Sequence, residues 1–270
     1  MRDLPQPMAH PTLGVMPIVY ALQADCVWHS PAENHRAVHD AVLRAKVASG
    51  SMIVLPEMFD VGFTMDTAVA CEAAPETTAF LAGLARSTKT LVIAGHATRD
   101  KEGRATNSAS VFDAAGEQIA RYVKCHGFTP AGEREAYAAG DGPIVFDWEG
   151  LKVAPLICYD LRFPELFRAA TKLSAEVFVV IANWPDARVA HWVTLAKARA
   201  IENQAYVIAV NRCGRDPNYV YPGRSLIIDP KGDVLAEAGD GVEMLTAEID
   251  PDVVRGWRRD FPALCDARFL

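Results

Sequence analysis

Three side chains that together could carry out acyl transfer each follow an apolar, strand-like run. Glu57 ends the run 52–57, Lys124 ends the run 120–124, and Cys158 directly follows the apolar residues 153–157. Taken singly, such a cysteine is usually a small core residue, and a lone glutamate or lysine is usually solvated. In combination, the carboxylate could take the proton of a thiol whose pKa is otherwise ~8.5, and the ammonium could stabilise an oxyanion. The three residues therefore indicate a cysteine nucleophile with its base and its oxyanion donor.

Charged residues crowd the turn after Cys158. Asp160 and Arg162 follow it closely, and Pro164 then begins a helix-like pattern. An Asp-x-Arg pair on a tight turn is consistent with a structural ion pair, and Arg162 is equally consistent with binding a substrate carboxylate. Both interpretations stay open. His126 and His191 also leave a cysteine–histidine pairing possible, although no spacing favours it.

The elements that must position these side chains alternate between strand and helix patterns. Apolar runs, several with polar residues only at their ends, occupy 14–23, 52–57, 91–96, 108–114, 151–159, 177–184, 206–212 and 225–230. Amphipathic patterns predict helices at 31–49, 77–89, 164–175 and 187–204, and the turns 113–117 and 229–233 predict hairpins. Asn183-Trp184 and Asn211-Arg212 end two further runs. The mixture indicates an α/β sandwich with its polar residues at the carboxyl ends of strands, where ligands bind.

Composition and charge argue against several classes of protein. The 270 residues are 50% hydrophobic and carry a net charge of −7 without a basic tract, so neither nucleic acid nor an anionic membrane is expected as a partner. No apolar stretch reaches the ~20 residues that span a bilayer. Residues 1–14 lack the apolar core of a signal peptide and are interpreted as an extension before a single domain.

The six cysteines are scattered, at positions 26, 71, 125, 158, 213 and 265. No C-x-x-C pair occurs, which argues against a zinc site and against a disulfide framework. We therefore expect a reducing, cytoplasmic setting in which an isolated thiol stays reactive.

The segments around the three reactive residues resemble the nitrilase superfamily, the carbon–nitrogen hydrolases. The resemblance rests on "LPEMFDVGFTM" around Glu57, "RYVKCHGF" around Lys124 and "LICYDLRFPELFR" around Cys158, and it continues through 182–214 and 221–239. It implies a four-layer αββα sandwich over residues 15–270 and a Glu-Lys-Cys triad that needs neither metal nor organic cofactor. It also implies a homodimer or higher homo-oligomer, formed through helices near the nucleophile. The tail 255–270 would reach across that interface, or would simply pack on its own subunit.

The resemblance assigns a role to each catalytic group. Cys158 attacks the carbon of an amide, Glu57 acts as general base, and Lys124 with the backbone N–H of Tyr159 holds the oxyanion. Ammonia leaves, and water then hydrolyses the thioester. Glu133, which its spacing from Lys124 favours over Glu135, would position the substrate amide unless it is an ordinary solvated loop residue. The expected substrate-binding residues are Tyr159, Phe63, Phe128, Arg162 and Trp184.

Within the superfamily, "CYDLRFPE", "ANWP" and "ARAIENQ" are most similar to the omega-amidase branch. That branch hydrolyses the terminal amide of 2-oxoglutaramate and 2-oxosuccinamate. Arg162, Arg188 and Arg212 lie near predicted strand ends and are candidates for pairing with the distal carboxylate of such a small amide. Gly127-Phe128 stands where the family commonly has Leu-Phe, which affects the expected pocket wall and not the triad.

Other activities share the same triad. A deaminated-glutathione amidase, an aliphatic amidase, a carbamoylase or a true nitrilase stays possible, since only the pocket distinguishes them. A catalytically silent scaffold on the same fold is the alternative outside enzymes. The intact Glu57, Lys124 and Cys158 argue against it.

Overall fold

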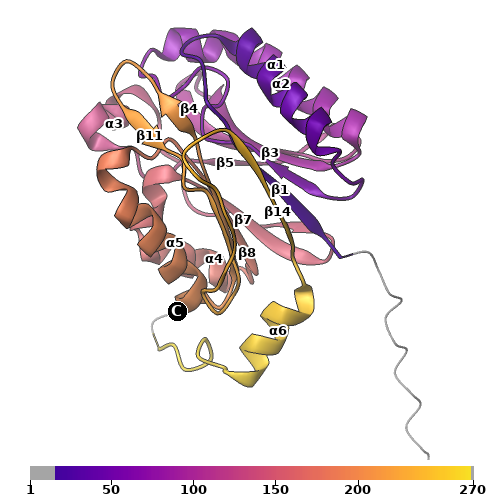
Figure 1. The fold of residues 1–270 in the computed structure, drawn as a ribbon. Coiled ribbons are helices and arrows are strands. Elements are labelled where there is room, and N and C mark those ends of the chain that lie inside the picture. The colour runs from indigo at the N-terminus through magenta and orange to yellow at the C-terminus, as the bar shows by residue number, and fades with distance from the viewer. Residues whose placement is uncertain (1–15, 269–270) are drawn as a thin grey trace, which may run out of the picture.

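The structure, a computed structural model, describes residues 16–268, so the extension predicted for residues 1–14 lies outside the described residues. Two six-stranded sheets form its body (Figure 1). The first sheet has the order β14-β1-β2-β3-β4-β5, in which β2 runs parallel to β1 and to β3 and the other neighbours are antiparallel. Its strands are β1 (Ile18–Gln23), β2 (Met52–Val54), β3 (Leu91–Arg99), β4 (Ala105–Phe112), β5 (Gln118–Val123) and β14 (Glu243–Glu248).

The second sheet has the order β13-β12-β9-β8-β7-β6, with β8 parallel to β7 and to β9. Its strands are β6 (Phe146–Trp148), β7 (Leu151–Ile157), β8 (Val177–Ala182), β9 (Tyr206–Asn211), β12 (Leu226–Ile228) and β13 (Val234–Glu237). A small hairpin pairs β10 (Cys213–Arg215) with β11 (Val220–Pro222). Because β7, β8 and β9 are parallel, the residues that follow them gather at one edge of the sheet.

Helices cover the outer face of each sheet (Figure 1). Those on the first sheet are α1 (Pro31–Ala45) and α2 (Thr67–Thr88), and those on the second are α4 (Pro164–Lys172) and α5 (Val189–Asn203). The remaining helical elements are η1 (Thr129–Ala131), α3 (Glu133–Ala136), η2 (Cys158–Arg162), η3 (Asp186–Arg188) and α6 (Pro251–Asp260). The arrangement confirms the predicted four-layer αββα sandwich.

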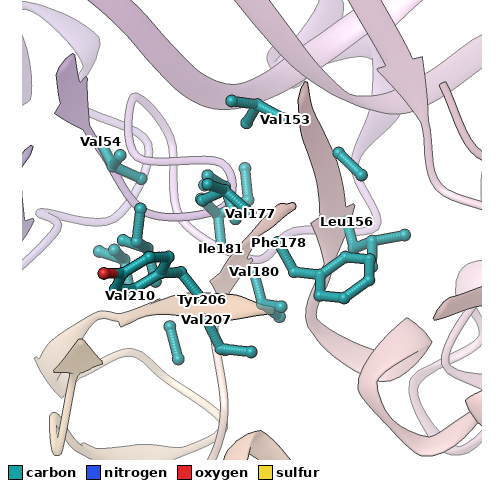
Figure 2. Close-up of a cluster of buried hydrophobic side chains, with 14 of the residues drawn as sticks. Val54, Val153, Leu156, Val177, Phe178, Val180, Ile181, Tyr206, Val207 and Val210 are labelled. Carbon is teal, nitrogen blue, oxygen red and sulfur yellow. The ribbon is translucent and has the colours of Figure 1, made fainter. Parts of the chain in front are cut away.

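The alternation of side chains along the strands explains this layering. In β1, Val19 and Ala21 belong to the core between the two sheets, whereas Tyr20 and Leu22 pack with α1 and α2 on the outer face. The central strands of the second sheet are covered on both faces, so β8 is buried throughout. Figure 2 shows part of the core, with Val54 of the first sheet among side chains of β7, β8 and β9.

Two predicted helix boundaries were wrong. The first helix begins at Pro31 as expected but ends before Lys46, whose φ of 51° is left-handed, and does not continue to Gly50. The second helix begins at Thr67 and not near residue 77. Proline inside a helix removes one backbone hydrogen bond, yet α2 continues through Pro75, because residues on both sides of it pack against the first sheet and its loops.

Helix α6, in the predicted interface tail, packs on its own subunit. Arg255 donates to the Glu176 carboxylate, with Nε 2.8 Å from Oε1. Arg258 donates to the carbonyl oxygens of Ala175 (2.6 Å) and Gln204 (2.9 Å). These hydrogen bonds attach the start of the tail to its own chain, and its role in an interface stays a prediction.

Candidate active site

Glu57 lies in the turn that follows β2, and Gly95 of β3 makes room for it. A Cβ on Gly95 would lie 2.5 Å from Glu57 Cα and 2.9 Å from Met58 N, closer than real Cβ contacts. Phe59 N donates to Gly95 O, and Gly95 N donates to Pro56 O, both at 3.1 Å. The turn is thus fixed on β3, and the Glu57 side chain is fully buried.

Cys158 follows β7 with φ 47°, in the left-handed region that non-glycine residues seldom adopt. The residue is 7% exposed, and its Sγ lies 3.8 Å from the carbonyl oxygen of Asn183, the residue after β8. Burial and then the charge of Glu57 raise the pKa of the Cys158 thiol well above its usual value, although Lys124 opposes them. The Cys158 side chain therefore rests as a neutral thiol, which would need a base in order to act as a nucleophile.

Lys124 lies between two carboxylates. Its Nζ donates to Glu57 Oε1 at 2.8 Å and to Glu133 Oε1 and Oε2 at 2.9 and 2.8 Å. All three side chains are buried. Burial favours the neutral amine, but Glu133 and Glu57 outweigh it and raise the pKa of Lys124 well above its usual value. An ammonium has three N–H donors, so these contacts hold a charged Lys124 in one orientation.

Two asparagines complete this network, and the sequence assigned them no role. Asn107 of β4 donates through Nδ2 to Glu57 Oε1 (2.7 Å) and to Glu133 Oε1 (2.8 Å). Asn183 donates its backbone N–H to Glu57 Oε2 (2.8 Å) and its Nδ2 to Glu57 O (2.7 Å). Asn183 carried a signal as a polar residue at the end of an apolar run. Asparagine is uncommon within strands, so the position of Asn107 inside the apolar pattern of β4 was a further signal of a functional residue.

Asp160 and Arg162 do not form an ion pair, so the structural-pair interpretation was wrong. The Asp160 carboxylate points inward and accepts the backbone N–H of Ile157 at 3.1 Å. The Arg162 guanidinium lies over the Trp184 ring, 4.8 Å from its centroid, and contacts His191 Nδ1 at 3.2 Å. In a helical turn, residues two apart do not share a face, which separates the two side chains.

A pocket with about 350 Å³ of empty space adjoins Cys158. All five predicted substrate-binding residues line it, namely Tyr159, Phe63, Phe128, Arg162 and Trp184. Asn183, Pro185, Arg188 and Tyr219 complete the lining. The pocket is therefore aromatic, with the thiol and two guanidinium groups in its wall and no carboxylate.

The two arginines of the pocket differ from the third predicted one. Within residues 16–268, no carboxylate lies within ion-pair distance of Arg162 or Arg188. Arg212 is instead fully buried outside the pocket, where its Nη2 donates to Asp25 Oδ1 (3.0 Å) and Cys26 O (2.9 Å). The expectation that Arg212 reads a substrate carboxylate was wrong, because its guanidinium joins the end of β9 to the segment after β1.

We also searched the part of the chain that the structure describes for disulfides, metal-binding clusters and membrane-spanning helices. The six cysteines are free thiols. Residues 16–268 contain no group of three or more His, Cys, Asp or Glu side chains arranged to hold a metal ion. No helix among the same residues has the length and apolar character to cross a bilayer.

Comparisons with known proteins identify the family of this chain. The carbon-nitrogen hydrolase family model matches residues 18–259. The chain is 39% identical to the omega-amidase YafV of Yersinia enterocolitica, over 92% of this chain and 96% of the relative. It is 34% identical to the 2-oxoglutaramate amidase of Bacillus subtilis, over 93% and 97%. A crystal structure of XC1258 from Xanthomonas campestris, a CN-hydrolase superfamily protein with an arsenic adduct in its active site, aligns with a TM-score of 0.88 at 29% identity, covering 95% of this chain and 99% of that one. The chain belongs to the carbon–nitrogen hydrolase family, and it is an amidase that hydrolyses carbon–nitrogen bonds.

Proposed function

We propose that this enzyme is an omega-amidase that hydrolyses the terminal carboxamide of a short 2-oxo dicarboxylate monoamide, 2-oxoglutaramate or 2-oxosuccinamate. The products are the dicarboxylate and ammonia. The observation that carries the proposal is the pocket at Cys158, in which Arg162 and Arg188 have no carboxylate partner among residues 16–268. Guanidinium groups in an aromatic wall suit a substrate that brings its own carboxylate.

Acylation begins with the neutral thiol. Glu57 takes the proton of Cys158 as Sγ attacks the carboxamide carbon, and the carbonyl oxygen becomes an oxyanion. Lys124 and the backbone N–H of Tyr159 stabilise it; Tyr159 lies in the first turn of η2, where N–H groups lack intrahelical partners. The C–N bond then breaks, the proton on Glu57 passes to the nitrogen, and ammonia leaves a thioester on Cys158.

Deacylation uses the same groups. Glu57 takes a proton from water as the water oxygen attacks the thioester carbon, and Lys124 with the Tyr159 N–H again holds the oxyanion. The C–S bond breaks, and the proton returns to Sγ. Glu133 keeps Lys124 charged and oriented through both halves, since its two oxygens lie 2.9 and 2.8 Å from Nζ.

The charge of the pocket favours this substrate class over a simple amidase or nitrilase. A simple aliphatic amide or nitrile would leave both guanidinium groups without a partner. The names of the relatives in Yersinia enterocolitica and Bacillus subtilis support the same choice.

Ammonia release from a panel of amides and nitriles tests the proposal. Because a polar site discriminates strongly against an analogue that lacks the matching group, 2-oxoglutaramate should exceed butyramide in kcat/KM by ~10⁴-fold. Arg188→Met and Arg162→Met should lower this ratio while leaving butyramide turnover within a few-fold of wild type. Equal turnover of butyramide, or of a simple nitrile, and 2-oxoglutaramate would assign the enzyme to another activity, and no turnover of any compound would favour a silent scaffold.

We also propose that the enzyme is a cytoplasmic homodimer that pairs through α4 and α5. Leu173 and Ile201, near the carboxyl ends of these helices, are 51% and 54% exposed, and a dimer formed through α4 and α5 would cover them. Light scattering after gel filtration should give twice the chain mass, and Leu173→Glu with Ile201→Glu should give the monomer. A wild-type monomer would contradict the dimer, and fractionation of cells tests the compartment.

A further inference from the structure

Asp160 is completely buried, and three of the four hydrogen bonds of its carboxylate leave its own turn. Its Oδ2 accepts the backbone N–H of Ile157 (3.1 Å) and the hydroxyl of Tyr122 (2.7 Å). Its Oδ1 accepts the backbone N–H of His126 (3.0 Å) and lies 2.8 Å from His126 Nδ1. Since a carboxylate can only accept, the contact with His126 requires the proton on Nδ1.

These bonds join the two sheets at the catalytic edge. Tyr122 lies in β5 of the first sheet and His126 in the loop after it, so the pair flanks Lys124 in sequence. Asp160 belongs to η2, which follows β7 of the second sheet and begins with Cys158. Holding the turn alone would need only the bond to Ile157. The other three bonds all go to the segment that carries Lys124.

We propose that Asp160 and His126 are positioning residues, which hold the Lys124 segment at a fixed separation from the nucleophile turn. This inference rests on the proposed amide hydrolysis, in which Lys124 must meet the oxyanion that forms beside Sγ. A displacement of ~1 Å at a reacting group costs ~10²-fold in rate. The two groups come from different sheets, so a direct hydrogen-bonded connection between their segments controls this separation.

The ring of His126 has a second contact, which allows its two roles to be separated. It stacks on Phe163, with centroids 3.7 Å apart and an interplanar angle of 7°. Phe163 in turn meets Tyr159, a residue of the pocket wall, edge-on at 5.3 Å. Phenylalanine at position 126 keeps an aromatic stack but has no side-chain N–H. Asparagine keeps a side-chain donor near the position of Nδ1 but loses the stack.

The decisive experiment compares His126→Phe, His126→Asn and Asp160→Asn in the full-length enzyme. With 2-oxoglutaramate, His126→Phe should lower kcat by ~10–100-fold with KM within about three-fold, because transition-state positioning is lost and binding is not. His126→Asn should restore kcat to within about three-fold of wild type. Asp160→Asn, which puts an NH₂ group among donors, should lose at least as much as His126→Phe.

A second readout follows the nucleophile without any amide substrate. Iodoacetate labelling of the Cys158 peptide, followed by mass spectrometry across pH, reports how strongly Lys124 favours the thiolate. A displaced Lys124 should move this labelling profile to higher pH in His126→Phe and leave it unchanged in His126→Asn. Cys265, which is exposed, gives the internal reference in the same digest.

Two results would overturn the positioning role. Folded His126→Phe with wild-type kcat and labelling profile, even at a lower melting temperature, would make the contact purely structural. His126→Asn as slow as His126→Phe would assign the effect to the ring stack. Failure of wild type on 2-oxoglutaramate would overturn only the proposed substrate, because the labelling profile and any accepted amide still test the positioning. If Asp160→Asn does not fold, the two His126 variants decide.

Discussion

At the scale of single residues, the site is assembled before substrate arrives. Glu57 accepts hydrogen bonds from Lys124 and Asn107 on Oε1 and from the backbone N–H of Asn183 on Oε2. Lys124 is charged and directs its N–H groups at two carboxylates, while the Cys158 thiol is held neutral by burial and by Glu57. During the reaction, therefore, one proton leaves the thiol and one new negative charge develops, on the oxyanion. Donors that are already oriented stabilise such a charge best.

Replacing Cys158 tests the nucleophile directly. Cys158→Ala and Cys158→Ser should release no measurable ammonia, because no other group in the pocket can form the thioester. The Ala variant should unfold in urea at close to the wild-type midpoint, since the side chain is small. Retained ammonia release by a well-folded Ala variant would remove the assignment.

Asn107 should prove important for rate although it touches no substrate. Asn107→Leu keeps the approximate volume and removes the Nδ2 donor that Glu57 and Glu133 share. We expect kcat to fall ~10–100-fold with a small change in KM, as both carboxylates lose an orienting partner. Steady-state kinetics of ammonia release measure this. A change confined to KM would place Asn107 in substrate binding.

At the scale of elements, short segments with unusual backbone positions carry the catalytic groups. β2 has three residues, yet the turn after it delivers Glu57, with Met58 at φ 43°. Such a turn needs close contact with a neighbouring strand, and Gly95 of β3 provides it. The turn at Cys158 also contains a left-handed residue, because Cys158 itself has a φ of 47°. Strained positions of this kind persist only where surrounding packing holds them.

Gly95→Ala tests the fit between β3 and the Glu57 turn. The new Cβ would meet Glu57 Cα at 2.5 Å, so the turn must move and the base must shift with it. We expect kcat to fall ~10²-fold and the melting temperature to drop. Gly83→Ala in α2 is the matched control: its Cβ meets nothing within 4 Å, and alanine is the better helix former by ~0.5–1 kcal/mol. Wild-type kcat in both variants would contradict the role given to Gly95.

At the scale of the whole molecule, a buried polar chain connects the helices to the catalytic turn. His35 of α1 contacts Thr77 of α2 at 3.1 Å, and Thr77 donates to Asp60 at 2.8 Å. Asp60 lies three residues after Glu57, is fully buried, and has no cationic partner among residues 16–268. Burial raises the pKa of Asp60 from 3.8 to about 6, against the opposing effect of its hydrogen bonds.

This carboxylate should make the enzyme less stable as pH rises from about 4 to about 6. In that window the folded state keeps a proton that the unfolded state has released, so the free energy of unfolding falls, by about 3 kcal/mol in total. Asp60→Asn should remove this slope and be more stable than wild type at pH 8, with little difference at pH 4. Urea unfolding across pH measures it, with the exposed Asp40→Asn as control. Parallel curves for Asp60→Asn and wild type would contradict the assignment.

Sequence by itself determined the αββα class and the main strands, and it predicted Glu57, Lys124 and Cys158 as the catalytic groups. Periodicity, residue types and short motifs are local properties of the chain, so they can be recognised from the sequence alone. It missed β6, β10, β11 and β14, none of which contains more than two consecutive apolar side chains. It also placed the first two helices inaccurately, because tertiary packing carried α2 through Pro75.

Only the tertiary structure decided how the side chains pair. Asn107 contacts the carboxylates of both Glu57 and Glu133 because of the register of the strands. Arg162 lines the pocket, whereas Asp160 contacts His126. Arg212 is buried away from the site. Side-chain partners across two sheets depend on long-range register and on the rotation of each turn. Neither is encoded in the spacing of residues along one segment.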